Sequence, residues 1–462
     1  RWVLFLSFLC SLGLSAFAQD STALYRIGSV SFEGNKVSKP SILYREMTLN
    51  SGDRVTRSEL VAKLDRAKNN LRNLNIFNFV ETDTCITDTV VDVVVRLVER
   101  WYIIPEPILS YADRNLGEWM STGWKLDRLD YGLLVRWKNF RGRNETLILT
   151  AKFGYNNTFG FKYKFPYVGP NRKLGLNLKF SFTRNHEVSY AAVDNKRIFF
   201  RDHDQYSQVQ YHGSAELVFR PQLYNRHGFG LKYTDAVVTD TIAQLNPDYF
   251  NPGNTGSRFF SISYTIKHDK RDYNVYPLSG HIFESSIRKD GLGLFNTSVN
   301  MLEIQAKYSR FWKLQPRWYL AMGLKLKASP LPKQAYYAQR GLGYNTDFVR
   351  GYELYIIDGQ YYGLFKSTLR FEAMPSKVLN LKFIGSDKFG LIPITIYTNV
   401  HFDAGYVADR IFENGNPLAN RFIAGGGLGL DLVTYYDVVW RLEYSLNDRV
   451  EHGFFIHFTK HI

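Results

Sequence analysis

The sequence has almost no cysteine. Two cysteines occur in 462 residues, and Cys10 lies in an N-terminal segment that we interpret below as a signal peptide. The expected mature chain therefore keeps Cys85 alone, which excludes an internal disulfide. Small folds that depend on several disulfides are excluded with it.

Long apolar runs are also missing. Beyond the N-terminus, no apolar run reaches the roughly 18 residues that a membrane-spanning helix needs. The mean hydropathy of -0.26 agrees with this. With 45% hydrophobic and 22% charged residues, the chain is not disordered by composition. These values exclude a helical membrane protein and favour a folded chain.

The motifs of common enzymes are absent too. There is no G-x-S-x-G elbow and no phosphate-binding loop, and the glycine-rich run over residues 425–430 does not fit the dinucleotide fingerprint. We interpret that run as small residues in a crowded strand. The 10 histidines show no metal-ligand spacing, because strand geometry separates even His457 and His461 too far for one metal. We therefore predict no catalytic residue, no metal and no cofactor.

Charge is unbalanced, with 58 Lys and Arg against 43 Asp and Glu, a formal net charge of +15. The basic residues are scattered through the expected strands and not clustered on a helix or loop, which argues against nucleic acid as a partner. Attraction to anionic lipid head groups or lipopolysaccharide is the interpretation we favour. Aromatic residues reach 16%, with 31 Tyr and 34 Phe, and such side chains suit a membrane interface.

Residues 1–18 are typical of a secretory signal peptide. A basic start is followed by a short apolar core and by Ala16-Phe17-Ala18, an A-x-A cleavage site. The bulky residues before Cys10 do not fit a lipoprotein signal. Because the sequence does not begin with Met, we expect a few residues to precede it.

Residues 24–99 predict one small α+β domain. A second helix is expected from Thr56, because Glu59 lies three residues on and completes a capping box. The expected elements are a strand over 25–35, a helix over 41–47, the helix from Thr56, and strands over 77–82 and 90–97. The apolar residues on one face of the second helix are Leu60, Leu64, Ala67, Leu71 and Leu74.

From residue 101 to 462 the pattern has a period of two. One expected strand alternates over 174–183, and others alternate over 147–155 and 318–327. In the last strand, one face carries Phe454, Ile456 and Phe458, and the other carries Phe455, His457 and Thr459.

This alternation fits a soluble sandwich or a transmembrane barrel. The signal peptide, the long series of strands and their aromatic ends favour the barrel. Because a bilayer does not tolerate open sheet edges, we expect the sheet to close. About 360 residues at roughly 22 per strand and connection give about 16 strands. The predicted fold is an all-β transmembrane barrel of about 16 antiparallel strands over residues 101–462, preceded by one small α+β domain.

Residues 348–352 carry an arginine in an expected long loop. A guanidinium inside a barrel lumen needs a carboxylate, and Asp403 is the first choice and Glu372 the second. Gly351 would permit a tight turn, and Tyr352 would pack on the wall. The arginine either braces the barrel or positions the loop for function, and the two roles are compatible.

Two prolines predict a weak seam. Pro105 and Pro107 have no N–H to donate, and residues two apart in a strand face the same neighbour. If this edge faces the last strand, with Phe454, Ile456 and Phe458, the barrel has a seam that can open sideways. Alternatively, both prolines lie in a linker before the strand. Continuous backbone pairing between 103–109 and 453–461 would exclude the open seam.

These motifs resemble those of BamA/TamA-like outer-membrane insertases. Residues 349–352 are similar to the tip motif of the family's lumen loop, and Asp403 to Gly405 resembles the D-x-G motif that receives it. Residues 437–444 resemble the penultimate strand. A POTRA domain, the family's periplasmic module, is indicated by Ile27, Val30, Phe32, Gly34 and Asn35. The turn of the bacterial surface antigen barrel is indicated by Asp269, Arg271, Asp272, Pro277 and Gly280.

The sequence departs from the family pattern at two positions. His401 stands where the strand motif usually has an aromatic residue, and Ile462 where the chain usually ends in one.

The resemblance implies a protein of the outer membrane of a Gram-negative bacterium, with its POTRA domain in the periplasm. The domain would bind unfolded outer-membrane protein clients by strand addition, and the seam would template their strands. Periplasmic chaperones or accessory assembly proteins are further implied partners, and no enzyme activity is implied.

Two other functions remain open. A secretion pore of the two-partner type usually has two POTRA domains and a plugging helix, whereas this sequence has room for one domain and no plug. A structural barrel that stabilises an assembly complex is the third hypothesis.

Overall fold

The computed structural model describes residues 24–111, 126–169, 172–250, 254–295, 299–331, 334–381, 385, 387–411, 415–434 and 436–458. The chain divides into two compact units, residues 1–99 (unit 1) and 100–462 (unit 2). The expected signal peptide over 1–18, and the C-terminal His461 and Ile462, lie outside the described residues.

Unit 1 is a four-stranded sheet in the order β2-β1-β4-β3 with two helices. Strand β1 pairs with β4 in parallel, and the other two ladders are antiparallel. The three-residue strand β2 was not predicted, because so short a segment shows no alternation. The elements are β1 (Leu24–Glu33), α1 (Pro40–Glu46), β2 (Arg54–Thr56), α2 (Arg57–Arg72), β3 (Phe77–Thr87) and β4 (Val90–Glu99).

The start of α2 is fixed by the predicted capping box. The Thr56 hydroxyl accepts from the Glu59 backbone N–H at 3.3 Å, and the Glu59 carboxylate accepts from the Thr56 N–H at 2.9 Å. The apolar face then buries Leu60, Leu64, Ala67 and Leu71. The helix ends at Arg72, so the fifth expected face residue, Leu74, lies beyond it.

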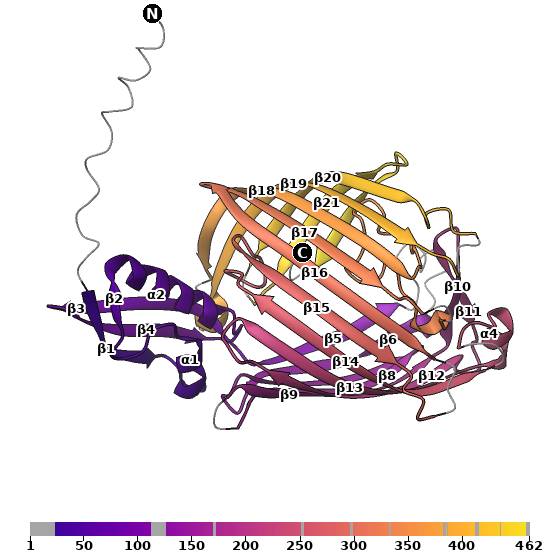
Figure 1. The fold of residues 1–462 in the computed structure, drawn as a ribbon, viewed down its shortest axis with the longest axis horizontal. Coiled ribbons are helices and arrows are strands. Elements are labelled where there is room, and N and C mark those ends of the chain that lie inside the picture. The colour runs from indigo at the N-terminus through magenta and orange to yellow at the C-terminus, as the bar shows by residue number, and fades with distance from the viewer. Residues whose placement is uncertain are drawn as a thin grey trace, which may run out of the picture. The chain divides into compact units, whose positions relative to one another are not determined.

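Unit 2 is built on a 16-stranded sheet whose sequential neighbours are antiparallel, which confirms the predicted fold class (Figure 1). Its strands are β5 (Ile103–Tyr111), β6 (Leu129–Phe140), β7 (Glu145–Gly154), β8 (Asn157–Val168), β9 (Leu174–Asn185), β12 (Gln208–Phe219), β13 (Asn225–Val238), β14 (Gly256–Asp269), β15 (Gly280–Asp290), β16 (Met301–Gln315), β17 (Trp318–Ala328), β18 (Tyr361–Asn380), β19 (Leu391–Ala408), β20 (Phe422–Val433), β21 (Val439–Asn447) and β22 (His452–Phe458).

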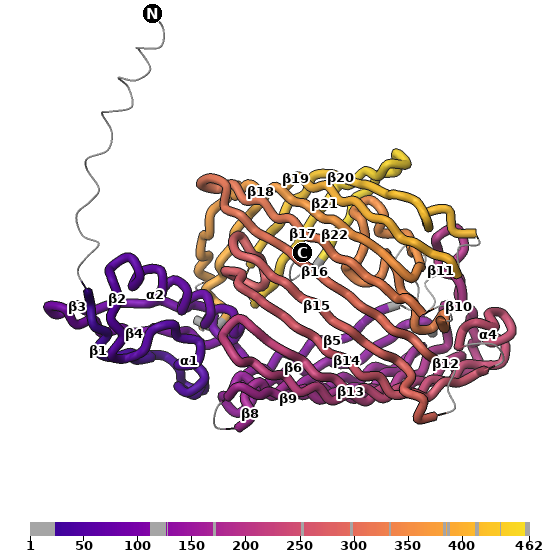
Figure 2. Tube along the Cα trace, in the orientation of Figure 1, coloured from indigo at the N-terminus to yellow at the C-terminus, as the bar shows by residue number. Residues whose placement is uncertain are grey.

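The sheet has apolar side chains outside and polar side chains inside. On β21 the outward residues Trp440, Leu442, Tyr444 and Leu446 are exposed, and the inward residues Arg441, Glu443, Ser445 and Asn447 are buried. A soluble protein has the opposite arrangement, whereas a barrel in a bilayer requires this one. Figure 2 shows the tilted strands running side by side around the unit.

No helix in the described part of the chain is long and apolar enough to cross a membrane.

The connections are short at the end of the barrel where β5 begins (the proximal end) and several are long at the other (the distal end). One distal connection holds the hairpin β10 (Glu187–Val193) and β11 (Lys196–Arg201), and another holds α4 (Asp240–Leu245). The connection between β17 and β18, residues 329–360, is called the lumen loop below. Its 3-10 turn is η2 (Tyr336–Ala338); the other short helices are η1 (Leu126–Arg128) and α5 (Asp387–Gly390).

We predict that Thr56→Ala destabilises unit 1 by about 1 kcal/mol, because the Glu59 backbone N–H in the first turn of α2 loses the Thr56 hydroxyl as its acceptor. Hydrogen exchange of the first α2 amides in the full chain should speed up about fivefold. Bonding to the Thr56 N–H also lowers the pKa of Glu59. The ionised Glu59 carboxylate therefore stabilises unit 1 above its unfolded-state pKa. This stabilisation is lost as the pH falls through the lowered pKa of Glu59 in the folded state. Unchanged exchange in the variant would contradict this assignment.

Candidate functional site

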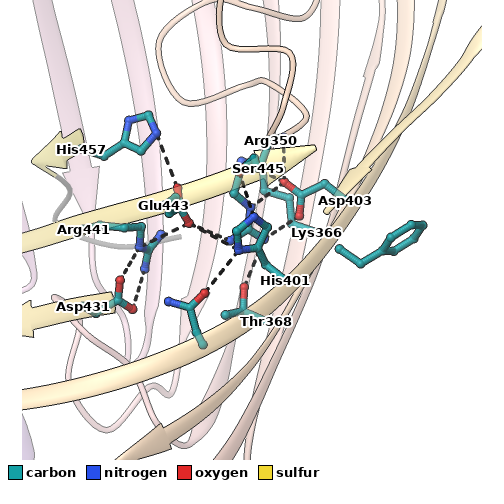
Figure 3. A network of polar contacts seen from close by, with 12 residues as sticks. Arg350, Lys366, Thr368, His401, Asp403, Asp431, Arg441, Glu443, Ser445 and His457 are labelled. Atoms are coloured by element: carbon teal, nitrogen blue, oxygen red, sulfur yellow. Dashed lines mark hydrogen bonds and ion pairs between the residues drawn. The ribbon is translucent and has the colours of Figure 1, made fainter. Parts of the chain in front are cut away.

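The tip of the lumen loop is attached to the barrel wall by Arg350. Its Nε lies 2.8 Å from Asp403 Oδ2 and its Nη2 lies 2.5 Å from Oδ1, so the pair is bidentate (Figure 3). The Arg350 backbone N–H also donates to Asp403 Oδ2 at 3.1 Å. The exposed fractions are 3% for Arg350 and 0% for Asp403. The structure thus brings together the two residues that were paired from the sequence.

A second carboxylate on β21 completes the surroundings of Arg350. Its Nη1 lies 3.2 Å from Glu443 Oε1. Its Nη2 donates to the Ser367 carbonyl at 3.0 Å and to the Thr368 hydroxyl at 3.1 Å. Each guanidinium nitrogen therefore has a partner, as a buried cation requires.

Glu372, the second expected partner of Arg350, lies elsewhere, and this expectation was wrong. On β18 it is Lys366 that lies opposite Asp403. Glu372 is six residues further along the strand, about 20 Å away at the usual rise. Its carboxylate instead accepts from the Tyr319 hydroxyl at 3.5 Å.

The wall that receives the loop tip is a row across four strands. Lys366, Asp403, Gly425 and Asn447 are direct neighbours from β18 to β21. Lys366 Nζ lies 3.7 Å from Asp403 Oδ2 and 4.4 Å from the centroid of the Phe348 ring. Asn447 Nδ2 donates to the Gly351 carbonyl at 2.9 Å. The row therefore contacts the loop in three ways: an ion pair with Arg350, a lysine over the Phe348 ring, and a hydrogen bond to the Gly351 backbone.

Glycines provide the space for the loop backbone. A Cβ on Gly425 would lie 2.0 Å from the Arg350 carbonyl oxygen, and one on Gly405 would lie 2.9 Å from Val349 Cγ2. Gly351 itself has a φ of +95°, which favours glycine. The glycine-rich run over 425–430 thus includes a position, Gly425, where the loop backbone leaves no room for a side chain.

The aromatic residue of the tip is buried. Tyr352 packs with Val349 in a core cluster that the loop shares with the wall. Its hydroxyl donates to Asp448 Oδ1 at 2.5 Å, and the Tyr355 hydroxyl donates to Glu451 Oε1 at 2.9 Å. Both acceptors follow β21, so the loop is also bonded to the connection that leads into β22.

Glu443 extends the network to the last strand. Its Oε2 lies 3.5 Å from His457 Nε2 on β22. Its Oε1 lies 3.8 Å from Arg441 Nε, which is also 2.7 Å from Asp431 Oδ1. His401, which departs from the family pattern, is buried and its Nε2 lies 3.1 Å from the Ser445 hydroxyl. A histidine here makes polar contacts that an aromatic hydrocarbon could not make.

The turn motif between β14 and β15 is held together locally. Arg271 forms a bidentate pair with Asp269, at 2.8 and 2.7 Å. Asp272 Oδ1 accepts from the backbone N–H of Tyr273 at 2.8 Å and of Leu278 at 3.1 Å. Gly280 has a φ of +95°. The motif therefore fixes the conformation of a long turn.

The same turn reaches across to the wall that carries the loop site. The Pro277 carbonyl accepts from Arg370 Nη1 at 2.9 Å, and the Tyr276 hydroxyl donates to Asp431 Oδ2 at 2.7 Å. Through Asp431 and Arg441 the turn joins the network of Glu443. The two motifs that are far apart in sequence thus belong to one set of contacts.

The 16-stranded sheet does not close among the described residues. Its order begins at β22 and ends at β5, and no ladder or backbone hydrogen bond joins residues 103–111 to 452–458. The expected closure is therefore not observed in this part of the chain. The pairing that would exclude an open seam was expected between 103–109 and 453–461, and of this range residues 459–461 lie outside the described residues.

Pro105 and Pro107 lie within β5, so the linker alternative was wrong. The backbone groups of Tyr102 point toward β6, because its carbonyl accepts from the Lys138 N–H at 2.8 Å. By alternation, the backbone N–H and C=O groups of the even-numbered residues of β5 point toward β6. The nitrogens of the two prolines therefore point toward the edge that has no ladder among the described residues. On β22, Phe454 and Ile456 are 85% and 63% exposed on the outer face. The side chain of Phe458 lies outside the described residues.

Asp437 forms a polar clasp at the proximal end of the seam. Its carboxylate lies 2.7 Å from Arg100 Nη1 and 3.6 Å from Lys138 Nζ, and it accepts from the Tyr273 hydroxyl at 2.7 Å. The Trp101 N–H donates to the Tyr436 hydroxyl at 3.0 Å. The connection between β20 and β21 is thereby bonded to the start of β5 and to β6. The free edges extend from this clasp toward the distal end.

Four residues of this site were not predicted from the sequence: Glu443, Lys366, Thr368 and Asn447. Glu443 alternates with apolar residues in the penultimate strand, which was a signal for an inward side chain. The contacts of the other three depend on strand register, which the sequence does not show. Among the described residues, no group of three or more His, Cys, Asp or Glu side chains could hold a metal ion.

A 16-stranded barrel with an inward-folded arginine loop, preceded by a small α+β domain, defines a class of outer-membrane proteins. Family models match residues 139–434 to the Omp85 superfamily domain and residues 25–100 to a POTRA domain, described as a surface antigen variable number repeat. The chain therefore belongs to the Omp85 superfamily, which confirms the resemblance seen in the sequence. Members of this family of insertases and transporters are not enzymes.

Solved structures share the fold. BamA from Haemophilus ducreyi lacking POTRA domains 1-3 is 17% identical, with a TM-score of 0.52, over 94% of this chain and 84% of that one. CdiB from Escherichia coli is 11% identical, with a TM-score of 0.55, over 94% of this chain and 75% of that one. No curated protein matches the sequence significantly.

We predict that Gly425→Ala displaces the loop tip, because the added Cβ would collide with the Arg350 carbonyl. The expected cost is about 1–3 kcal/mol. It should appear as a lower temperature at which the folded band disappears in seminative gel electrophoresis, and as faster proteolysis within residues 334–360. Gly213→Ala on β12 is the matched control, since nothing lies within 4 Å of its added Cβ. Equal effects of the two substitutions would show that Gly425 does not make room for the loop.

Proposed function

We propose that this protein is a non-enzymatic assembly factor that inserts β-barrel precursors into the outer membrane at the seam between β5 and β22. The observation that carries the proposal is that no ladder joins the two sheet edges, β5 and β22, among the residues that the structure describes. Unpaired strand edges pair readily with other chains. No nucleotide or covalent step is needed, because folding of the client in the membrane supplies the free energy.

The two edges differ in what they offer. Strand β22 contains no proline, so its free edge keeps its alternate N–H donors. On β5, Pro105 and Pro107 remove two donors from the free edge. An incoming strand would therefore pair first with β22 and be released more easily from β5.

The contacts of the lumen loop support a fixed template. Arg350 contacts β19 through Asp403 and β21 through Glu443, and Glu443 also lies near His457 of β22. We infer that the loop keeps the wall beside β22 in register while the outer edge of β22 stays free. In this role Arg350 is a positioning residue.

In unit 1, strand β3 is an edge of the sheet and spans 11 residues. We infer that this edge binds unfolded clients by strand addition before they reach the seam. The exposed apolar outer face of the barrel would contact lipid, and lipopolysaccharide and periplasmic accessory proteins are further proposed partners.

A secretion pore is the second candidate, and the similarity to the CdiB structure supports it. A structural scaffold is the third. Depletion of the protein separates them. General loss of outer-membrane proteins is expected for the insertase, loss of one secreted protein for the pore, and loss of neither for the scaffold.

The direct test is to cross-link the seam in a Cys85→Ser background. Cysteines at inward positions of β5 (Ile104, Glu106 or Ile108) would be combined with cysteines at Phe455 or His457. We expect oxidation to stop barrel insertion in proteoliposomes and reduction to restore it. The control pairs Ser286 with Gln305, which lie opposite each other on β15 and β16, and its cross-link should leave insertion intact. Insertion at the normal rate with the seam cross-linked would overturn the proposal.

A further inference from the structure

The wall opposite the tip of the lumen loop carries a group of lysines. The loop tip contacts the wall from β18 to β21, and the strands half a turn away in the sheet order are β8, β9, β12 and β13 (Figure 1). On these strands Phe161, Phe180 and Leu231 are exposed on the outer face. Alternation therefore directs their neighbours into the lumen. The inward lysines are Lys162, Lys164, Lys179 and Lys232.

Three of these lysines form a row around the wall. Lys162 lies opposite Lys179, which lies opposite Ser214, which lies opposite Lys232. At about 4.8 Å between neighbouring strands, the row spans about 14 Å. Lys164 lies two residues from Lys162 on the same face. Four positive charges are thus concentrated on one part of the lumen.

No described residue forms a hydrogen bond or ion pair with any of these four lysines. Other inward lysines are paired: Lys152 lies 2.5 Å from Asp130, and Lys325 lies 2.6 Å from Asp347. Two acids lie near the row in register. Glu216 is opposite Asn177 and accepts from Asn177 Nδ2 at 2.7 Å. Asp290 lies two strands from Lys232 in the same row and accepts from Arg288 Nε at 3.1 Å. The positive charge of the row is therefore not compensated by contact.

The lysines are also in contact with water. Lys164, Lys179 and Lys232 are exposed although they face the inside of the barrel. The contacts that Arg350 and Tyr352 make hold the loop tip on the opposite wall, so the tip does not cover this row. A hydrated region therefore lies beside uncompensated positive charge.

Charges of one sign on the wall of a narrow aqueous space raise the local concentration of the opposite ion. Rings of Lys or Arg select anions in pores, and barrels of 16 strands are wide enough to hold an aqueous channel. We propose that the lumen conducts small inorganic anions in preference to cations, and that Lys162, Lys179 and Lys232 determine this selectivity. The activity is additional to the proposed insertion of clients and requires neither an open seam nor a client.

The test measures reversal potentials of the full-length protein in planar bilayers of neutral lipid under a KCl gradient near 0.1 M. The chloride-to-potassium permeability ratio of the wild type is expected to exceed about 3. In the triple variant Lys162→Glu, Lys179→Glu and Lys232→Glu it should fall about tenfold, to a preference for potassium. Lys→Gln at the same positions should give an intermediate ratio. At 1 M salt the differences should shrink, because the Debye length falls from about 10 to about 3 Å.

The control changes the net charge equally but outside the barrel, by Lys36→Glu, Lys63→Glu and Lys68→Glu in unit 1. Its permeability ratio should equal that of the wild type. Folding of each variant is checked by its heat-dependent shift in gel electrophoresis, and the wild-type ratio tests the proposal without any variant. A wild type that prefers potassium or does not conduct would overturn the proposal. Equal ratios for the folded lumen variant and the wild type would also overturn it.

Discussion

The buried ion pair of Arg350 and Asp403 is the interaction on which the arrangement of the lumen depends. Burying two charges is costly unless their hydrogen bonds are satisfied, and removing one partner of such a pair costs about 3–5 kcal/mol. Here Asp403 accepts from the side chain and the backbone of Arg350, and Glu443, Ser367 and Thr368 accept from the rest of the guanidinium. The loop tip therefore has one position in which its charge is matched.

The position of the loop has consequences for the seam. Glu443 is shared between Arg350 and His457, so the loop and β22 belong to the same polar network. The turn after β14 reaches that network through Tyr276 and Asp431. Contacts inside the lumen thus hold the strands beside the seam in place. The edge of β22 that does not pair with β21 has no ladder among the described residues. A rigid strand with a free edge is what templating of another strand requires.

Much of this could be predicted from the sequence, where the signal was local. Period-two alternation gave the strands, the Thr56 and Glu59 spacing gave a helix start, and one arginine in a loop pointed to Asp403. The second carboxylate was missed because the choice between Glu372 and Glu443 depends on register across strands. The Asp437 clasp joins residues more than 300 positions apart, at Arg100 and Asp437. Closure of the sheet was expected from the bilayer, and a weak seam was expected from Pro105 and Pro107. Among the described residues no ladder joins β5 to β22.

The central claim is that Arg350 and Asp403 stabilise the loop as a coupled pair. A double-mutant cycle with Arg350→Ala and Asp403→Ala, followed by urea unfolding in lipid vesicles, measures this coupling directly. The account predicts a coupling free energy of about 1–3 kcal/mol for this pair, and additivity for Arg350→Ala with Glu372→Ala. Additivity of the Arg350 and Asp403 substitutions within about 0.5 kcal/mol would contradict it.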